Sequence, residues 1–442
     1  MTETLSSNNY RDLISTTAPV TSEKAFSGVK AILAATLGNL LEIYDFIVFG
    51  MFAIPISKSF FPNSSEASAL LLTFLIFGAG FLARPLGAFV LGSYADRRGR
   101  KKALTLTLFL MATGTAFVAF CPGYRTIGIM APIIVVIGRL IQGFSAGGEI
   151  GSAVAMLVES APKEKRGFYA AFQQLSQGGG VLLAGLVGFT LSIIFTNDHL
   201  VDWGWRIAFA IGLLIVPVGL AIRRNVDETQ IFRQDKAIRK NSAFWGLVKE
   251  HKLAVLTAIG VMIFWTISSY VSNYFTTYSI KQLHLSSSAS YAGQIAYGLT
   301  MLVACPLCGL LSDRIGRKIP MLIGSAGTLI LSYPLFYLLT KFPSVQTLVL
   351  TQVVICLFLA LYGSCATAVL GEIFPTSVRA TGVAVSYAFG VMIFGGFTPA
   401  IITWLIAYIG DEMAISYYLA AASLISCVIV MFLSDRRATE DL

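Results

Sequence analysis

The stretch that decides the fold is Gly92-Ser-Tyr-Ala-Asp96-Arg97-Arg98-Gly99-Arg100-Lys101-Lys102. A close copy returns 217 residues later as Gly309-Leu-Leu-Ser-Asp313-Arg314-Ile-Gly316-Arg317-Lys318. That spacing is close to half of the 442 residues, so the chain consists of two similar halves. Each copy is a short, charge-dense loop between two long apolar segments. Duplicated apolar segments with a loop signature are typical of the repeats from which transporters are built.

A second pair of loops repeats at nearly the same offset. Glu159-Ser-Ala-Pro162-Lys-Glu-Lys-Arg166 matches Glu372-Ile-Phe-Pro375-Thr-Ser-Val-Arg379, 213 residues later. In both, Pro follows Glu by three positions and Arg follows it by seven. Two signatures at nearly one offset predict a pseudo-symmetric pair of bundles.

Composition indicates a polytopic membrane protein. The chain is 56% hydrophobic and 12% charged, whereas a soluble domain carries about 25% charged residues. A bilayer-spanning helix needs about 20 apolar residues. The sequence predicts an all-α protein with twelve such helices, at about 28–56, 66–95, 102–121, 126–157, 166–195, 204–222, 252–280, 287–312, 318–339, 345–373, 377–408 and 413–433.

These helices predict two six-helix bundles, residues 28–222 and 252–433. A tail (1–27), a charged linker (223–251) and a second tail (434–442) lie outside them. Of the 32 basic residues, 25 fall on one predicted side of the membrane and 5 on the other. Because positive charge stays on the cytoplasmic side, we expect the linker and both termini to be cytoplasmic. The first 27 residues lack the pattern of a cleaved secretory signal, so we expect the first helix to be retained.

Several classes of function find no support in the sequence. The net charge of +9 is explained by topology, so we expect no nucleic-acid partner. No phosphate-cradling Gly loop is present, which argues against an ATP-driven pump, and no catalytic constellation indicates an enzyme. Cys305-x-x-Cys308 lies inside a predicted helix without further ligands, so we expect no metal site and no cofactor.

Five ionisable residues lie well inside the predicted helices, all in the first half unless Glu372, at the cytoplasmic end of its helix, is counted: Glu42, Asp45, Arg84, Arg139 and Glu149. A charge at the bilayer centre costs on the order of 2.5–3.5 kcal/mol by insertion scales, so it marks a function or a pair. The repeat places Cys305 opposite Arg84, Gln352 opposite Arg139 and Tyr362 opposite Glu149. The helical framework therefore does not itself require these charges.

Glu42 and Asp45 are candidates for proton coupling. They lie three residues apart on one helix face, and two close carboxylates in a low dielectric rarely both stay ionised. The alternative is that each acid pairs permanently with Arg84 or Arg139. The sequence does not decide which acid carries the proton, and Glu149 is a third candidate.

Arg84 and Arg139 are candidates for binding an anionic substrate, because a guanidinium binds carboxylate bidentately and stays charged. Their other possible partners are the acids of the first helix. We favour substrate contact for at least one of them. Further candidates are Gln142, Gln173, Gln177, Asn273, Tyr274 and Tyr387, for each of which interhelical hydrogen bonding is an equally good explanation.

The repeated loops predict a cytoplasmic gate built from Asp96, Arg97, Gly99, Arg100, Glu159 and Arg166, and from their second-half counterparts Asp313, Arg314, Gly316, Arg317, Glu372 and Arg379. Helix N-termini attract anions. We therefore expect Asp96 near residues 376–379 and Asp313 near Arg166, at the start of the 166–195 helix. The alternative is a basic loop that only sets topology.

The two loop signatures, together with Arg139-x-x-Gln142-Gly143, resemble the major facilitator superfamily over about residues 28–433. More narrowly, four stretches resemble the metabolite:proton symporters, which carry citrate, oxoglutarate, shikimate and betaine or proline. These stretches are Gly38-Asn39-Leu-Leu-Glu42-Ile-Tyr-Asp45-Phe46, Arg84-Pro85-x-Gly87, Gln142-Gly143-Phe144-Ser145-Ala146-Gly147-Gly148-Glu149 and Trp203-Gly204-Trp205-Arg206. Phe77-Gly78-x-Gly80-Phe81, Gly167-Phe168-Tyr169 and Phe394-Gly395-Gly396-x-Thr398-Pro399 are most similar to the citrate and tricarballylate carriers.

This resemblance implies a proton-coupled symporter that works by alternating access in a bacterial inner membrane. Betaine carriers of the group have Lys where this chain has Arg139, which favours a polycarboxylate such as citrate. Antiporters of the superfamily carry a Gly-Pro pair where Gly178-Gly179-Gly180 precedes Val181, which favours symport. We expect a monomer whose partners are a small organic anion, a proton and the lipid bilayer. The alternatives are a carrier of betaine or proline and, less favoured, a non-transporting metabolite sensor.

Overall fold

The computed structural model describes residue 36, residues 39–40, 42–98, 100–147, 150–159, 161–224, 251–375 and 378–433. Every regular element in these ranges is helical. In the first half they are a segment at Glu42–Met51, α2 (Ala53–Phe60), α3 (Glu66–Leu82), α4 (Arg84–Arg98), α5 (Arg100–Phe120), α6 (Tyr124–Ile127), α7 (Met130–Gly147), α8 (Ile150–Glu159), η1 (Lys163–Lys165), α9 (Arg166–Ile194), α10 (Asn197–His199), η2 (Leu200–Gly204) and α11 (Trp205–Arg224).

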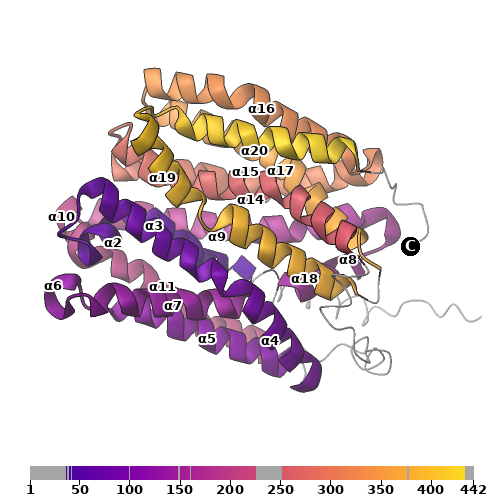
Figure 1. Cartoon of the computed structure of the whole chain (residues 1–442), viewed down its shortest axis with the longest axis horizontal. Coiled ribbons are helices and arrows are strands. Elements are labelled where there is room, and N and C mark those ends of the chain that lie inside the picture. Colours follow the sequence, from indigo (N-terminus) through magenta and orange to yellow (C-terminus); the bar gives the residue numbers. More distant parts are fainter. Residues whose placement is uncertain are drawn as a thin grey trace, which may run out of the picture.

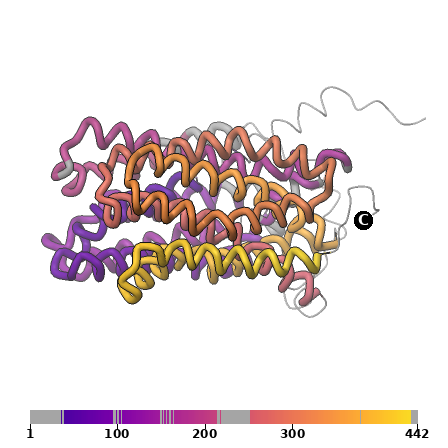
Figure 2. Tube along the Cα trace, turned by 90° about the horizontal axis from the view of Figure 1, so that it is seen from above, coloured from indigo at the N-terminus to yellow at the C-terminus, as the bar shows by residue number. Residues whose placement is uncertain are grey.

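The second half has fewer, longer elements. They are α14 (Lys252–Lys281), α15 (Ser287–Ile315), α16 (Lys318–Lys341), α17 (Val345–Glu372), α18 (Arg379–Gly390), η3 (Val391–Gly395), α19 (Thr398–Ile409) and α20 (Ala414–Met431). The long helices of both halves run roughly parallel to one common axis, with the first half below and the second half above in Figure 1. The view from above shows the same shared direction (Figure 2).

Each of the twelve predicted spans coincides with a helix or a broken helix within the described ranges. Nine helices in this part of the chain are long and apolar enough to cross a membrane alone, and a bent pair makes a tenth. The remaining two predicted spans correspond to α5 and α11. The parts of the chain proposed as tails and linker fall mostly outside the described residues.

Three predicted spans are broken rather than continuous. The first bends by 67° between Met51 and Ala53, just before Pro55, whose missing N–H cannot bond to the carbonyl one turn back. The second is interrupted at Ala83, two residues before Pro85. The eleventh passes through the π-helical turn η3, which ends at Gly395, four residues before Pro399. The apolar runs predicted the spans, and their prolines account for the breaks.

Close glycine contacts bring the charged residues of the first half together. A Cβ at Gly143 of α7 would lie 1.6 Å from the carbonyl oxygen of Gly80 in α3, and one at Gly147 would lie 2.0 Å from that of Arg84. Such backbone approach is possible only without side chains at these positions. It sets α7, which carries Arg139, directly against the junction of α3 and α4, which carries Arg84.

Candidate transport site

Arg139 is fully buried in α7 and is held by aromatic rings and one amide. Its guanidinium carbon lies 4.6 Å from the ring centre of Phe49, 4.7 Å from that of Phe46 and 5.0 Å from that of Phe77. Its Nη1 donates to Oε1 of Gln142 at 2.8 Å. Cation–π contacts of this kind each contribute on the order of 0.5–2 kcal/mol.

Part of the hydrogen-bonding capacity of the Arg139 guanidinium is unused among the described residues. Its Nε and Nη2 find no acceptor among the described residues, and Asp45 and Arg139 form no direct ion pair there. A buried cation with unsatisfied donors is costly. An anion that reached these two nitrogens would offset that cost.

Arg84, at the start of α4, lies beside the same aromatic group. Its guanidinium carbon is 4.7 Å from the ring centre of Phe46 and 4.6 Å from that of Phe81, and the residue is only 2% exposed. Phe46 therefore contacts both guanidiniums. Tyr387 of α18 lies within electrostatic range of Arg84 and Glu42, which connects this group to the second half.

The two acids of the first helix have different neighbours although they lie three residues apart. Asp45 accepts from the hydroxyl of Thr115 in α5, and its Oδ1 faces Gly212 of α11. Glu42 lies within electrostatic range of Tyr270 and Tyr387 in the second half. Asp45 thus points into its own bundle, whereas Glu42 lies near the interface between the bundles.

A small cavity of about 40 Å³ lies between the halves. A cavity of this size holds about three water molecules, so a larger ligand requires the halves to move apart. Its polar and aromatic lining comes from both halves: Phe46, Gln177, Trp265, Tyr270, Tyr297 and Tyr387. Phe46 stands between the cavity and the two guanidiniums, since it lines the one and contacts the others.

Of the eight predicted substrate residues, Gln177 and Tyr387 line this cavity, and six do not: Arg84, Arg139, Gln142, Gln173, Asn273 and Tyr274. Gln173 is buried with an unbonded amide nitrogen. Asn273 packs against Gly50, and neither atom of its amide finds a partner among the described residues. The Tyr274 hydroxyl accepts from Thr403 at 3.3 Å, and its ring packs 5.4 Å from Phe74. The Gln142 side chain forms two hydrogen bonds within the protein, accepting from Arg139 and donating to Thr115.

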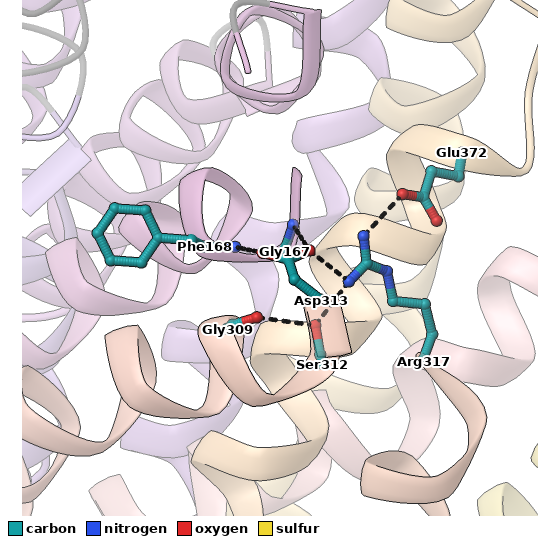
Figure 3. Close-up of polar contacts among 7 residues, drawn as sticks. All are labelled: Gly167, Phe168, Gly309, Ser312, Asp313, Arg317 and Glu372. Carbon is teal, nitrogen blue, oxygen red and sulfur yellow. Dashed lines mark hydrogen bonds and ion pairs between the residues drawn. The ribbon is translucent and has the colours of Figure 1, made fainter. Parts of the chain in front are cut away.

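Among the residues predicted to form the gate of the second half, Asp313, Arg317 and Glu372 form a connected cluster (Figure 3). Asp313 accepts from the backbone N–H groups of Gly167 at 2.7 Å and Phe168 at 2.9 Å, at the N-terminus of α9. Arg317 donates to Asp313 at 2.8 Å and to Glu372 at 3.1 Å. Asp313 therefore links the second half to the first.

Arg317 keeps its positive charge in this cluster. Burial, the largest single influence, lowers the pKa of Arg317, but the carboxylates of Glu372 and Asp313 together outweigh it, so its pKa is raised above the ordinary value. The guanidinium therefore stays protonated at physiological pH.

The other gate candidates are placed less completely. Arg314 is exposed, Gly316 adopts a positive φ of 88° at the end of α15, and Arg379 is buried at the start of α18. Arg166 is half-buried beside the cluster, and no hydrogen bond reaches its Nε. Glu149, Gly99 and the side chains of Asp96, Arg97, Arg100 and Glu159 lie outside what the structure describes.

The two halves also meet at the opposite end. Lys281, at the end of α14, forms an ion pair with Glu66, at the start of α3. Nearby, Phe52 packs 5.6 Å from Tyr291. Contacts between the halves thus lie on both sides of the cavity, at the Lys281–Glu66 pair and at the Asp313 cluster.

Thr115 and the phenylalanines around the two arginines were not predicted as site residues. A Thr or Phe in an apolar helix carries no signal by itself. The spacing of the phenylalanines could have indicated their role. Phe81 lies one helical turn after Phe77, and Phe49 lies one turn after Asp45, so each pair shares a helix face.

Paired helical bundles that close around a central cavity flanked by buried charge define a membrane transporter. Sequence comparison agrees: the profile of the family "Sugar (and other) transporter" matches residues 30–237, and that of the "Major Facilitator Superfamily" matches residues 281–441. The fold is similar to that of the proton:xylose symporter XylE, with a TM-score of 0.76 at 21% identity over 94% of this chain and 97% of the other.

Relatives with assigned names show to which group of this superfamily the chain belongs. The chain is 38% identical to the citrate-proton symporter of Salmonella typhi over 92% of this chain and 93% of the relative. It is 33% identical to the alpha-ketoglutarate permease of Escherichia coli K12 over 94% and 95%. It is also 33% identical to the proline/betaine transporter of that strain over 90% and 82%. The chain belongs to the major facilitator superfamily and, within it, to the metabolite:proton symporters.

Proposed function

We propose that this protein is a proton-coupled symporter that imports citrate or a related di- or tricarboxylate by alternating access. The observation that carries the proposal is Arg139, a buried guanidinium whose Nε and Nη2 have no acceptor among the described residues. Arg84 lies on the same aromatic ring. Two buried cations side by side suit a ligand with two or three carboxylates. The 38% identity to a citrate-proton symporter supports the same substrate class.

The proposed roles follow the geometry. Arg84 and Arg139 bind carboxylate, with Gln142, Gln177 and Tyr387 beside them, and Asp45 and Glu42 couple the proton. Gln173, Asn273 and Tyr274 act in the substrate path only if the halves rearrange. The Asp313 cluster and its counterpart at Asp96 form the cytoplasmic gate. Both termini and the 223–251 linker face the cytoplasm of a bacterium, and the protein works as a monomer.

A zwitterion carrier is the second candidate, because Trp265, Tyr270 and Tyr387 line the cavity. Aromatic rings bind quaternary ammonium groups, and a proline/betaine transporter is among the relatives. However, the rings of Phe46, Phe49, Phe77 and Phe81 already contact guanidiniums. A single-carboxylate ligand would leave one of the two cations uncompensated unless Glu42, Asp45 or Glu149 balanced it.

The deciding experiment is uptake of labelled citrate, oxoglutarate and betaine into proteoliposomes, with and without an imposed pH gradient. We expect carboxylate accumulation that depends on the gradient, and little betaine uptake. Gradient-driven betaine accumulation without carboxylate uptake would contradict the proposal. Binding of a carboxylate with no transport under any gradient would favour a sensor.

A further inference from the structure

An unbroken chain of hydrogen bonds joins Arg139 to Asp45. Arg139 Nη1 donates to Gln142 Oε1 at 2.8 Å, Gln142 Nε2 donates to Thr115 Oγ1 at 2.9 Å, and Thr115 Oγ1 donates to Asp45 Oδ2. The four side chains come from α7, α5 and the Glu42–Met51 segment, and each is at most 5% exposed. Every donor points the same way, from the cation towards the carboxylate.

Thr115 is the one link in this chain with a choice of acceptor. Its hydroxyl also lies 3.0 Å from the carbonyl oxygen of Met111, one helical turn back. A hydroxyl has one proton to donate and two lone pairs with which to accept. It can therefore donate either to Asp45 or to Met111, but not fully to both.

The acceptor to which Thr115 donates depends on whether Asp45 is protonated. When Asp45 is ionised, Thr115 donates to Oδ2 and accepts from Gln142. When Oδ2 carries a proton, that proton is donated to Thr115, whose own hydroxyl then turns to Met111 while Gln142 still donates to its second lone pair. Both states satisfy Thr115 and keep the bond from Gln142, but that bond is polarised less when Asp45 is neutral, because hydrogen bonds in a chain polarise one another.

The surroundings of Asp45 leave this chain as its main polar connection. Arg139 is the charged group of α7 that acts on Asp45, and Arg84 of α4 contacts the ring of the next residue, Phe46. Thr115 faces Asp45 from α5, and α11 presents Gly212 to Oδ1. Glu42 is the only other acid on the same described segment.

We propose that Thr115 is a positioning residue that transmits the protonation of Asp45 to Arg139 through Gln142. An ionised Asp45 draws the chain of donors towards itself and balances the Arg139 charge. Protonation removes that balance, so Arg139 gains preference for an anionic ligand. Proton and anion then bind together, which is what symport requires. This inference rests on the proposed function.

The test compares purified wild type with Thr115→Val, Thr115→Ser and Thr113→Val in proteoliposomes. Thr113 is the matched control, because it lies on the same helix and its hydroxyl bonds to the Phe109 carbonyl at 2.9 Å. A one-unit pH gradient supports about tenfold accumulation for one coupled proton. We expect this ratio to fall towards one in Thr115→Val, with exchange of citrate retained, and to persist in Thr115→Ser and Thr113→Val.

The pH dependence of KM for citrate gives a second readout that a packing role would not alter. This pH dependence should flatten in Thr115→Val. It should flatten in Gln142→Leu as well, which removes the bond between Gln142 and Thr115 and replaces the first variant if Thr115→Val does not fold. Wild-type pH dependence and accumulation in both variants would overturn the inference.

Infrared pH-difference spectra separate this inference from the proposed function, since they need no substrate. The band of protonated Asp45, identified by its absence in Asp45→Asn, should shift in Thr115→Val and stay in place in Thr113→Val. An unshifted band overturns the role of Thr115 whatever the substrate is. Failure of wild type to accumulate any carboxylate overturns the proposed function instead.

Discussion

Asp313 of α15 accepts the backbone N–H of Gly167 at 2.7 Å, across the boundary between the halves. Its other oxygen accepts from the backbone N–H of Phe168, and Arg317 forms an ion pair with the same carboxylate. A carboxylate at a helix N-terminus is favoured by the helix dipole, and hydrogen bonds to a charged group contribute roughly 1.5–3 kcal/mol each. This contact therefore stabilises the conformation in which the two halves meet at this end.

Asp313→Asn should slow import by about tenfold or more, because hydrogen bonds to charged groups are the strong ones. Folding and membrane insertion should remain normal. Asp411→Asn is the matched control, since Asp411 also caps a helix start, by accepting from Met413 at 2.8 Å, but lies at the opposite end. Asp96→Asn tests the counterpart in the first half. Initial uptake rates per inserted molecule are the measurement, and wild-type rates in Asp313→Asn would leave only a topogenic role for the loop.

The ion pair between Lys281 and Glu66 should contribute much less. Glu66 is largely exposed, and exposed pairs contribute about 0–1 kcal/mol and are screened by salt. We expect Lys281→Glu to change uptake no more than a few-fold, and Lys281→Glu with Glu66→Lys to restore it. The accessibility of a cysteine placed nearby to a membrane-impermeant thiol reagent gives a direct measure. A loss as large as that of Asp313→Asn would show that this end governs transport instead.

Much of the architecture could be predicted because its signals are local or duplicated. Apolar runs predicted all twelve spans, and the repeat predicted that Asp313 would meet the start of α9. The breaks near Pro55, Pro85 and Pro399 were not predicted. Proline signals a break, but neighbouring helices decide whether a span bends or stays straight.

The hydrogen-bond chain could not be predicted because folding, not sequence spacing, brings it together. Thr115 lies 70 residues from Asp45 and 27 from Gln142. The i,i+3 spacing of Glu42 and Asp45 correctly placed them on neighbouring positions. It could not show that one would point towards α5 and the other towards α18, since a helix inside a bundle is covered on every side.

Packing of α3 against α7 predicts a strong effect on stability at Gly143. A Cβ there would lie 1.6 Å from the Gly80 carbonyl oxygen, which belongs to the backbone and cannot move aside alone. Gly143→Ala should therefore lower the yield of monodisperse protein and its melting temperature sharply, because overpacking costs about 1–3 kcal/mol or more. Gly92→Ala is the control, since nothing lies within 4 Å of a Cβ at that position. Equal melting curves for the two variants would contradict this packing.

Neutralising the acids should separate proton coupling from substrate movement. One of the two variants, Asp45→Asn or Glu42→Gln, alters the acid that carries the proton. That variant should abolish accumulation driven by a pH gradient while leaving exchange of substrate intact, because exchange needs no net proton transfer. Glu164→Gln, which alters an exposed acid in η1, is the control. If both variants still concentrate substrate against its gradient, the proton site lies elsewhere, and Glu149 becomes the first candidate.

The last prediction concerns the geometry of the two guanidiniums. Lys at position 139 or 84 keeps the positive charge but loses the planar fork that binds a carboxylate through two nitrogens. In Arg139→Lys the bond to Gln142 and the three aromatic contacts also depend on that plane. We expect citrate affinity, measured by calorimetry on purified protein, to fall by about tenfold or more, in line with the strength of charge-assisted bonds. Arg206→Lys is the control, because Arg206 bonds to the Asp202 and Cys121 carbonyls away from the cavity and should keep wild-type affinity. Tight betaine binding by wild type without carboxylate binding would contradict the anion site and favour the osmolyte carrier.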